Sequence, residues 1–468
     1  MRPRVVSAIA ILLCIVSSSL SAQPAREPVD LLLDGGTVVT MDPARHIITD
    51  AAVAIRGDSI VAVGPRQDLD PRFAPTNRLS TVGQLILPGL INGHTHAAMT
   101  LLRGLGDDLP LHDWLQDYIF PAEARNVDAD FVLWGTRLAA LEMIRSGTTT
   151  FTDMYFFEEA AAQATQESGM RAVLGEAILD FPTPDSKTPA DALAYAERFI
   201  KHWQGNALIT PAVAPHSTYL LSPGPLQAAF ALARRYHTPI LIHLAETIRE
   251  VDEERAKHGV SPVGYLERLG LLGPDLTAAH CVWIDAADIA LLVARGVGCV
   301  HNPSSNMMLG SGVAPVGEML AANMRLGLGT DGPAGSNNDL SMMEEMDLAA
   351  KLQKVSHRDP SALNAEAALA MGTIDGARAL HMESEIGSLE PGKKADLIVL
   401  SLDSPNAVPL YNIYAQVVYA LKGEDVRTVI IGGRIVMQDR HILTLDQADI
   451  VAHASGYAAT VMKSLSSQ

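Results

Sequence analysis

Short apolar runs alternate with helical patterns through most of the chain. The strand-like runs are rich in aliphatic residues and lie at 84–91, 148–153, 171–177, 208–214, 239–244, 276–280, 296–301 and 325–330. Segments with an apolar residue every three or four positions separate most of them, among them 131–147, 225–237 and 285–296. Eight strands alternating with helices predict an α/β fold, a parallel (β/α)8 barrel of the TIM type.

The two ends of the chain have a residue pattern that differs from that of the predicted barrel. Polar and apolar positions alternate there, which is typical of short strands joined by turns. Gly35-Gly36 and Gly57-Asp58 mark the positions of expected hairpins. The economical interpretation is a small β-sandwich domain built from both chain ends, with the barrel inserted between them. The expected parts are residues 29–83 and 386–446 for the β-sandwich, 84–385 for the barrel and 447–468 for a helical tail.

The first 21 residues resemble a secretory signal peptide. Arg2 and Arg4 precede the apolar run 5–16, and the small-residue segment SSSLSAQ follows. The run is about 12 residues long, well short of the roughly 20 that span a bilayer. We therefore expect cleavage after Ser21 or Ala22, a periplasmic or secreted protein, and no membrane span in the mature chain. The alternative to export is a cytoplasmic protein.

Charge and cysteine content narrow the classes of partner. Without Arg2 and Arg4 the chain has 33 of its 35 basic residues against 53 acidic ones, a formal charge of −20. A strongly acidic surface disfavours nucleic acid and anionic membranes as partners. Cys281 and Cys299 lie in apolar runs, so we expect two buried thiols, and a disulfide between them remains an alternative.

His94 and His96 end the first predicted strand, two positions apart. In a strand this spacing places both imidazoles on one face, at the barrel end where catalysis is expected. His243, His280 and Asp331 lie at the ends of three later strands. Three histidine nitrogens and one carboxylate oxygen suit zinc or a similar divalent ion, with one position left for water. The candidate ligands are His94, His96, His243 and Asp331; each alone would also fit a hydrogen-bonded histidine or a helix-capping aspartate.

Glu246 lies three residues beyond His243, in the segment HLAET. A carboxylate just past a metal-bearing strand can move protons between water and substrate. Its alternative role is a negative charge at a helix N-terminus. Together with the four candidate ligands, such a carboxylate indicates a metal-dependent hydrolase.

Five motifs together make the sequence similar to the amidohydrolase superfamily. They are PGLINGHTH, HLAET, AAHCVW, HNPSSNMMLGSG and GLGTDGPAGSNN, in this order. Within that superfamily the chain resembles the branch of 5-methylthioadenosine/S-adenosylhomocysteine deaminases and chloro-s-triazine hydrolases. The resemblance implies one divalent ion, Zn²⁺ or alternatively Fe²⁺ or Mn²⁺, on the four ligands named above. It also implies that Glu246 shuttles protons and that His280 holds the attacking hydroxide.

Three further residues match substrate-binding positions of this branch. Glu123 in IFPAEARN matches a glutamate that binds ribose hydroxyls, His216 in APHSTY a substrate-binding histidine, and Trp114 in LHDWL an aromatic beside the nucleoside. Their alternatives are a helix-end charge, a turn residue and plain packing. The branch also implies an arginine for the distal end of the substrate. The candidate segment, 181–193, offers only Lys187.

The expected activity is an aminohydrolase acting on the C–N bond of a cyclic amidine. The substrates implied are 5-methylthioadenosine, S-adenosylhomocysteine and adenosine, with the inosine compound and ammonia as products. A two-metal hydrolase is less favoured because the predicted fourth strand has no bridging lysine. Alternatives are deamination or dechlorination of guanine, cytosine, pterin or s-triazine, and a non-catalytic binding protein. The partners expected are a small-molecule substrate and, as an open alternative, further copies of the chain in a homo-oligomer.

Overall fold

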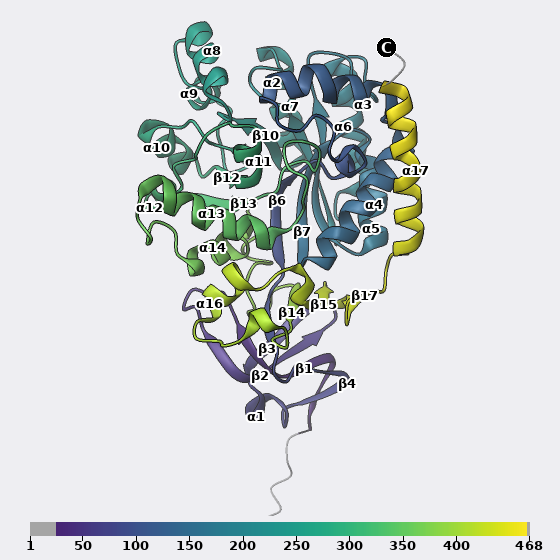
Figure 1. Ribbon diagram of the computed structural model, residues 1–468, viewed down its shortest axis with the longest axis vertical. Coiled ribbons are helices and arrows are strands. Elements are labelled where there is room, and N and C mark those ends of the chain that lie inside the picture. Colours follow the sequence, from purple (N-terminus) through teal and green to yellow (C-terminus); the bar gives the residue numbers. More distant parts are fainter. Residues whose placement is uncertain (1–24, 466–468) are drawn as a thin grey trace, which may run out of the picture.

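The structure is a computed structural model that describes residues 25–465. Its strands form two sheets, one of eight strands and one of nine. Figure 1 shows the barrel above a β domain, which gathers purple strands from the N-terminal region and yellow-green strands from the C-terminal region. The signal-peptide prediction concerns residues 1–21, which lie outside the described residues.

The eight-stranded sheet is the predicted parallel barrel. Its strands follow one another in chain order, and each of the eight apolar runs supplies one. β13 returns to β6, where the Asp331 backbone N–H donates to the His94 carbonyl at 2.9 Å. The Asn92 side chain also donates to Thr330 Oγ1 at 2.8 Å, so the two ends of the sheet are joined. The strands are β6 (Leu90–Thr95), β7 (Thr148–Tyr155), β8 (Arg171–Ile178), β9 (Ile209–Pro215), β10 (Ile240–Leu244), β11 (Leu276–His280), β12 (Gly298–His301) and β13 (Arg325–Leu328).

Helices surround the barrel and extend over the carboxyl ends of its strands. The three helices predicted from apolar periodicity form as α4, α7 and α10, and each begins within two residues of its expected start. The helices of this region are α2 (Leu111–Asp113), α3 (Phe120–Asn126), α4 (Ala129–Arg145), α5 (Glu158–Ser168), α6 (Pro189–Trp203), α7 (Pro223–Tyr236), α8 (Ile248–His258), α9 (Pro262–Arg268), α10 (Ala286–Arg295), α11 (Pro303–Met308), α12 (Val316–Ala321), α13 (Met342–His357), α14 (Ala365–Met371) and α15 (Ile374–Ala379). A 3-10 helix (Ala97–Leu102) and a π-helix (Trp114–Ile119) join β6 to α3.

Both chain ends contribute to the nine-stranded sheet, as predicted. Its order is β17-β16-β15-β14-β5-β1-β2-β3, with β4 paired to β1. The strands are β1 (Glu27–Val39), β2 (Ile47–Arg56), β3 (Ser59–Pro65), β4 (Phe73–Ser80), β5 (Leu85–Pro88), β14 (Leu397–Leu400), β15 (Val426–Ile431), β16 (Arg434–Gln438) and β17 (His441–Ile442). The short helices α1 (Arg66–Leu69) and α16 (Ile413–Ala415) accompany them.

Two local predictions in this region are wrong. The run 84–91 is not one barrel strand, because the chain bends at Pro88-Gly89 and β5 pairs antiparallel with β14 of the other sheet. Gly35-Gly36 is not a hairpin, because β1 continues through it as a bulge against β2. Gly35 has φ of +91°, a conformation that glycine adopts without strain. The hairpin expected at Gly57-Asp58 does join β2 to β3.

The C-terminal helix α17 (Gln447–Leu465) runs along the outside of the barrel against α4 and α3 (Figure 1). No helix in the described part of the chain is long and apolar enough to cross a membrane. Cys281 and Cys299 are buried and free, with their Sγ atoms 3.0 Å apart. The expected burial is confirmed, and the structure holds no bond between the two sulfurs.

Candidate metal and catalytic site

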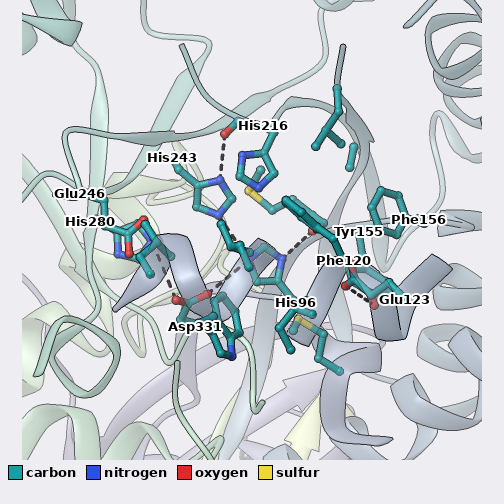
Figure 2. A pocket seen from close by; sticks show the side chains of 18 of the residues that line it. His96, Phe120, Glu123, Tyr155, Phe156, His216, His243, Glu246, His280 and Asp331 are labelled. Atoms are coloured by element: carbon teal, nitrogen blue, oxygen red, sulfur yellow. Dashed lines mark hydrogen bonds and ion pairs between the residues drawn. The ribbon is translucent and has the colours of Figure 1, made fainter. Parts of the chain in front are cut away.

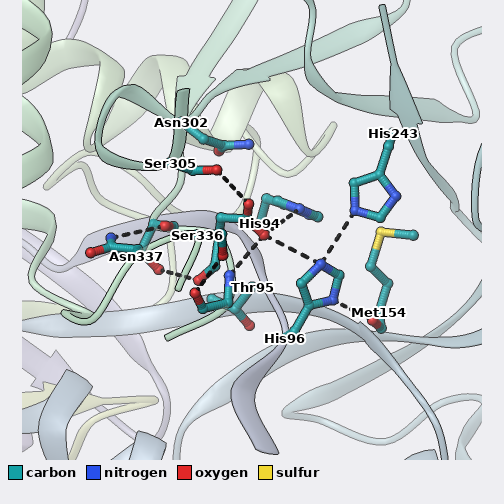
Figure 3. Close-up of polar contacts among 12 residues, drawn as sticks. His94, Thr95, His96, Met154, His243, Asn302, Ser305, Ser336 and Asn337 are labelled. Carbon is teal, nitrogen blue, oxygen red and sulfur yellow. Dashed lines mark hydrogen bonds and ion pairs between the residues drawn. The ribbon is translucent and has the colours of Figure 1, made fainter. Parts of the chain in front are cut away.

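Four side chains meet at the carboxyl ends of the first, fifth and eighth barrel strands. His94 lies on β6, His96 directly after it, His243 on β10 and Asp331 just after β13. Asp331 Oδ1 lies 3.3 Å from His94 Nε2 and 3.3 Å from His96 Nε2. His243 Nε2 lies 3.3 Å from His96 Nε2 (Figure 3). Residues that are 237 positions apart therefore form one compact group of nitrogen and oxygen ligands.

Backbone carbonyls determine which nitrogen of two imidazoles faces this group. His96 Nδ1 lies 2.7 Å from the Met154 carbonyl, and His243 Nδ1 lies 2.8 Å from the His216 carbonyl. A carbonyl oxygen can only accept a hydrogen bond, so each Nδ1 donates and each Nε2 is the nitrogen that faces the group. In the neutral imidazole this Nε2 offers a lone pair. His94 Nε2 is buried without a hydrogen-bond partner. Lone pairs that converge in this way suit a divalent cation between them, and the residues present fit such an ion.

The electrostatics of the group also favour a positive charge. Burial lowers the pKa of His94 to about 4, so its imidazole is neutral and available as a ligand. Burial also acts against a charged His96, but the hydrogen bond and charge of Asp331 outweigh it and raise its pKa to about 9. The carboxylate thus stabilises a cation at this point, whether a proton or a metal ion.

Glu246 and His280 face the same point from two neighbouring strand ends. His280 Nε2 lies 3.8 Å from Glu246 Oε2 and 3.9 Å from Asp331 Oδ2. Burial, and then the charge of Asp331, raise the pKa of Glu246 to about 8, so its carboxyl is mostly protonated at neutral pH. A protonated acid beside a carboxylate is a suitable arrangement for moving protons to and from a substrate.

Buried polar contacts hold these groups in place. The Glu250 carboxylate accepts the backbone N–H groups of Ala245 and Glu246, each at 2.8 Å. Ser305 Oγ donates to Asp331 Oδ2 at 2.7 Å. Ala245, His280 and Asp331 all have positive φ, between +51° and +74°, which costs free energy in residues other than glycine. Three of the strand ends that carry the candidate chemistry therefore include a residue with a strained backbone.

A cavity extends from this group toward α3. Glu123 lies at the far side, where its Oε1 accepts a hydrogen bond from Tyr155 Oη at 2.7 Å (Figure 2). Burial raises the pKa of Glu123 to about 7, although the Tyr155 hydrogen bond and then the charge of His96 lower it. Trp114 is buried against the cavity, and its Nε1 has no partner. His216 packs on His243 with 4.4 Å between the ring centroids.

The structure brings all nine residues singled out in the sequence to this one region. Eight line the cavity, and His94 lies behind it against Asp331. The sequence analysis missed several aromatic and polar residues that share the lining or support it. Among them Tyr155 ends β7, as the metal ligands end their strands, and this position was the signal that could have found it. The others are Phe120, Tyr219, Glu250, Ser305 and Asn306.

Comparison with known families agrees with this arrangement. The model of the amidohydrolase family matches residues 85–436, which is most of the chain. The chain belongs to the amidohydrolase family. The match begins at β5 and ends in β16, so it includes the whole barrel and part of the second sheet.

Individual amidohydrolases are similar to this one over nearly their full length. A protein of Syntrophobacter fumaroxidans named 5-methylthioadenosine/S-adenosylhomocysteine deaminase is 49% identical over 432 residues, which are 92% of this chain and 98% of that one. The crystal structure of an adenosine deaminase from Xanthomonas campestris with bound zinc is 39% identical and has a TM-score of 0.91, covering 94% of this chain and all of that one. An atrazine chlorohydrolase of Arthrobacter aurescens in complex with zinc has a TM-score of 0.86 at 23% identity, covering 92% and 100%, and shows the shared fold.

Proposed function

We propose that this amidohydrolase removes the exocyclic amine of adenosine derivatives by hydrolysis. The observation that carries the proposal is the pairing of two features in one cavity. A cation-binding group with the protonatable Glu246 forms one side, and the Glu123–Tyr155 pair forms the other. The first side suits attack of water on an aminated ring carbon, and the second suits the hydroxyls of a ribose. Support comes from the similar proteins named as deaminases of such nucleosides.

The proposed cofactor is one zinc ion held by His94, His96, His243 and Asp331. Three imidazoles and a carboxylate are a usual set for zinc, and the structure of the Xanthomonas protein has zinc bound. Fe²⁺ and Mn²⁺ use similar ligands and remain alternatives. When bound, the ion would lower the pKa of a water molecule at the site and so supply the nucleophile.

The chain's own residues would carry the proton transfers. His280 Nδ1 lies 3.1 Å from Asn306 Oδ1 and donates to it, so Nε2 is left to accept a hydrogen bond from the attacking water. Asp331 accepts the proton that the water loses. Glu246 donates its proton to the ring nitrogen next to the carbon under attack, which prevents negative charge from building up on the ring. Asp331 then passes its proton to the amine, the C–N bond breaks and ammonia leaves. The hydroxyl on the ring carbon returns a proton to Glu246 and becomes the carbonyl of the inosine product.

The remaining lining residues would position the nucleoside. Glu123 accepts hydrogen bonds from the ribose hydroxyls, and Trp114 and Phe120 pack on apolar parts of the substrate. Burial, then the charge of His96, lower the pKa of His216 to about 3, so it is a neutral hydrogen-bonding group. At neutral pH the negative charges of the site are therefore those of Asp331 and, in part, Glu123, and the positive charge is the cation that Asp331 stabilises.

The test is turnover of a substrate panel by the zinc-loaded protein, followed by absorbance. The panel contains 5-methylthioadenosine, S-adenosylhomocysteine, adenosine, guanine and cytosine. We expect deamination of the adenosine derivatives, loss of activity after chelation and recovery with added zinc. Turnover of guanine or cytosine without any adenosine derivative would show that the nucleoside assignment is wrong. No turnover in the panel, with the ion bound, would instead favour a binding protein.

We also propose that the chain is exported. The support is the charged, apolar and small-residue pattern of residues 1–21. Cell fractionation and N-terminal sequencing test it. A mature protein that starts near Ala22 or Gln23 in the periplasm or medium is expected, and an intact Met1 in the cytoplasm would contradict export.

A further inference from the structure

A second cavity adjoins the candidate catalytic cavity. The inner one encloses about 50 Å³ and the outer one about 430 Å³. They share lining residues from the segment between β6 and the start of α3 and from the loop after β9, namely Leu111, Leu115, Phe120 and Tyr219. Sites for small molecules usually measure about 300–1,000 Å³. The outer cavity is therefore the adjoining space that would receive the far end of a nucleoside bound at the metal side.

Groups of both charges line this outer cavity. Arg249 lies on the first turn of α8, and its Nε donates to Glu253 Oε1 at 2.7 Å. The hydrogen bond to Glu253, and then the charges of Glu253 and Asp113, raise the pKa of Arg249, so Asp113 on α2 lies near enough to interact. Among the described residues that line this cavity, Arg249 is the single arginine or lysine. Lys187, the basic residue of segment 181–193, lines neither cavity.

Arg249 is tied to the catalytic side through its own chain segment. It follows Glu246 by three residues, and the Glu250 carboxylate fixes the loop before α8 by accepting the backbone N–H groups of Ala245 and Glu246. Thr247 caps α8 by accepting from the Glu250 N–H at 3.2 Å. The same rigid segment thus places a proton donor in the inner cavity and a guanidinium at the outer one.

We propose that Arg249, Asp113 and Glu253 form a subsite for the α-amino-acid end of a substrate. The guanidinium would bind the carboxylate, and the two acidic side chains would bind the ammonium group. This inference rests on the proposed function, and within it names S-adenosylhomocysteine as a substrate that the chain recognises along its whole length. 5-Methylthioadenosine has no charged end and would leave the subsite empty.

The experiment compares the zinc-loaded wild type with Arg249→Gln. Substrates are S-adenosylhomocysteine, its decarboxylated analogue and 5-methylthioadenosine. For the exposed Arg249 we expect kcat/KM to fall about tenfold with S-adenosylhomocysteine, mainly through KM, and less than about twofold with the other two. Arg235→Gln on α7 is the matched control, because Arg235 is exposed and lines neither cavity; it should change none of the three.

Three outcomes would overturn the subsite. They are an equal loss with all three substrates, no loss with S-adenosylhomocysteine, and a wild type that deaminates 5-methylthioadenosine but not S-adenosylhomocysteine. The last would leave the proposed function intact, whereas a wild type inactive on every adenosine derivative would remove the proposed function itself. If Arg249→Gln does not fold, Arg249→Lys replaces it. Lysine keeps the charge but loses the forked geometry, so a smaller loss confined to S-adenosylhomocysteine is expected.

Discussion

At the scale of single residues, the site depends on which ring nitrogens and carboxyl groups carry a proton. The carbonyls of Met154 and His216 each accept a hydrogen bond from the Nδ1 of an imidazole, so the Nε2 atoms of His96 and His243 face each other. Glu246 is the reverse case, since burial keeps a proton on a group that is normally ionised. The cavity thus holds lone pairs for a cation on one side and an acidic proton on the other.

Glu246→Gln tests the proton donor. Glutamine keeps the shape of the side chain but cannot transfer a proton, so we expect kcat to fall about 10²- to 10⁴-fold. Metal content should be unchanged, because Glu246 is not among the four proposed ligands. Steady-state kinetics and metal analysis of the purified variant measure both. Near-normal turnover would show that another group donates the proton, and loss of metal would show that Glu246 supports the ion.

The pKa of Glu123 predicts how substrate binding depends on pH. Burial raises it to about 7, so the carboxyl is protonated below that pH and loses capacity to accept hydrogen bonds from a ribose. KM for adenosine should therefore rise as the pH falls below about 7, while KM for free adenine should lack this dependence. Kinetics with both substrates across this range measure it. Glu123→Gln should abolish the difference, and the same pH profile for both substrates would contradict ribose binding.

The sequence predicted the site residues that a local pattern marks, but not the contacts between residues far apart along the chain. His94 and His96 could be predicted from their spacing of two residues, and His243 and Asp331 from their positions at the ends of predicted strands. The hydrogen bond from Tyr155 to Glu123 joins two residues 32 positions apart, on β7 and α3. It therefore depends on where α3 lies over the barrel. The place of Arg249 at the outer cavity likewise depends on residues of α2 that line the same cavity.

At the scale of elements, strand prediction worked where both faces of the sheet are buried, the outer face by helices and the inner face by the side chains that fill the barrel. Such strands are continuous apolar runs, and seven of the eight begin within two residues of the prediction. The first run failed because two strands of different sheets, β5 and β6, follow each other with one residue between them. Apolar content cannot separate them, since both are fully buried. The signal was Pro88-Gly89, which interrupts the run.

The position of Trp114, in the segment between β6 and α3, depends on Gly335 in the loop after β13. Gly335 has φ of +84°, and a Cβ there would overlap Trp114 Nε1 and lie 3.0 Å from Trp114 Cδ1. Gly335→Ala should displace the indole and raise KM for nucleosides about tenfold or more, because small shifts of a positioning group are costly. Metal content should not change. Kinetics and tryptophan fluorescence measure the effect.

Gly224→Ala is the control for this variant. Gly224 lies on α7, and a Cβ there would meet nothing within 4 Å. Kinetics equal to the wild type are expected for it. If Gly335→Ala behaves in the same way, Trp114 does not position the substrate.

At the scale of the whole molecule, the catalytic end and the β domain lie at opposite ends of the barrel (Figure 1). β5 pairs with β1 on one side and with β14 on the other, so it joins the two chain ends directly before the barrel begins. The similar texture of both ends predicted this union. It could not predict the buried ion pair that attaches the β domain to the barrel, because its two members are 225 residues apart.

Removal of one partner of this ion pair should strongly lower the free energy of unfolding. Arg171 at the start of β8 donates Nε and Nη2 to the two carboxylate oxygens of Asp396, at 2.7 and 3.2 Å, and both side chains are almost fully buried. Arg171→Met leaves a buried carboxylate without its partner, so we expect a loss of about 3–5 kcal/mol in urea unfolding. Turnover per folded molecule should stay the same, since the pair is far from the cavity.

The double variant Arg171→Met/Asp396→Asn distinguishes a lost attraction from a stranded charge. An asparagine carries no charge, and its side-chain oxygen can keep the hydrogen bond that the Gly432 N–H donates to Asp396 Oδ1 at 2.6 Å. Because most of the cost of breaking a buried pair is the uncompensated charge, the double variant should be more stable than Arg171→Met alone. If instead the two losses add, the guanidinium stabilises the junction through its own packing and its bond to the Ala207 carbonyl. The order of the two unfolding midpoints therefore decides what holds the two parts of this amidohydrolase together.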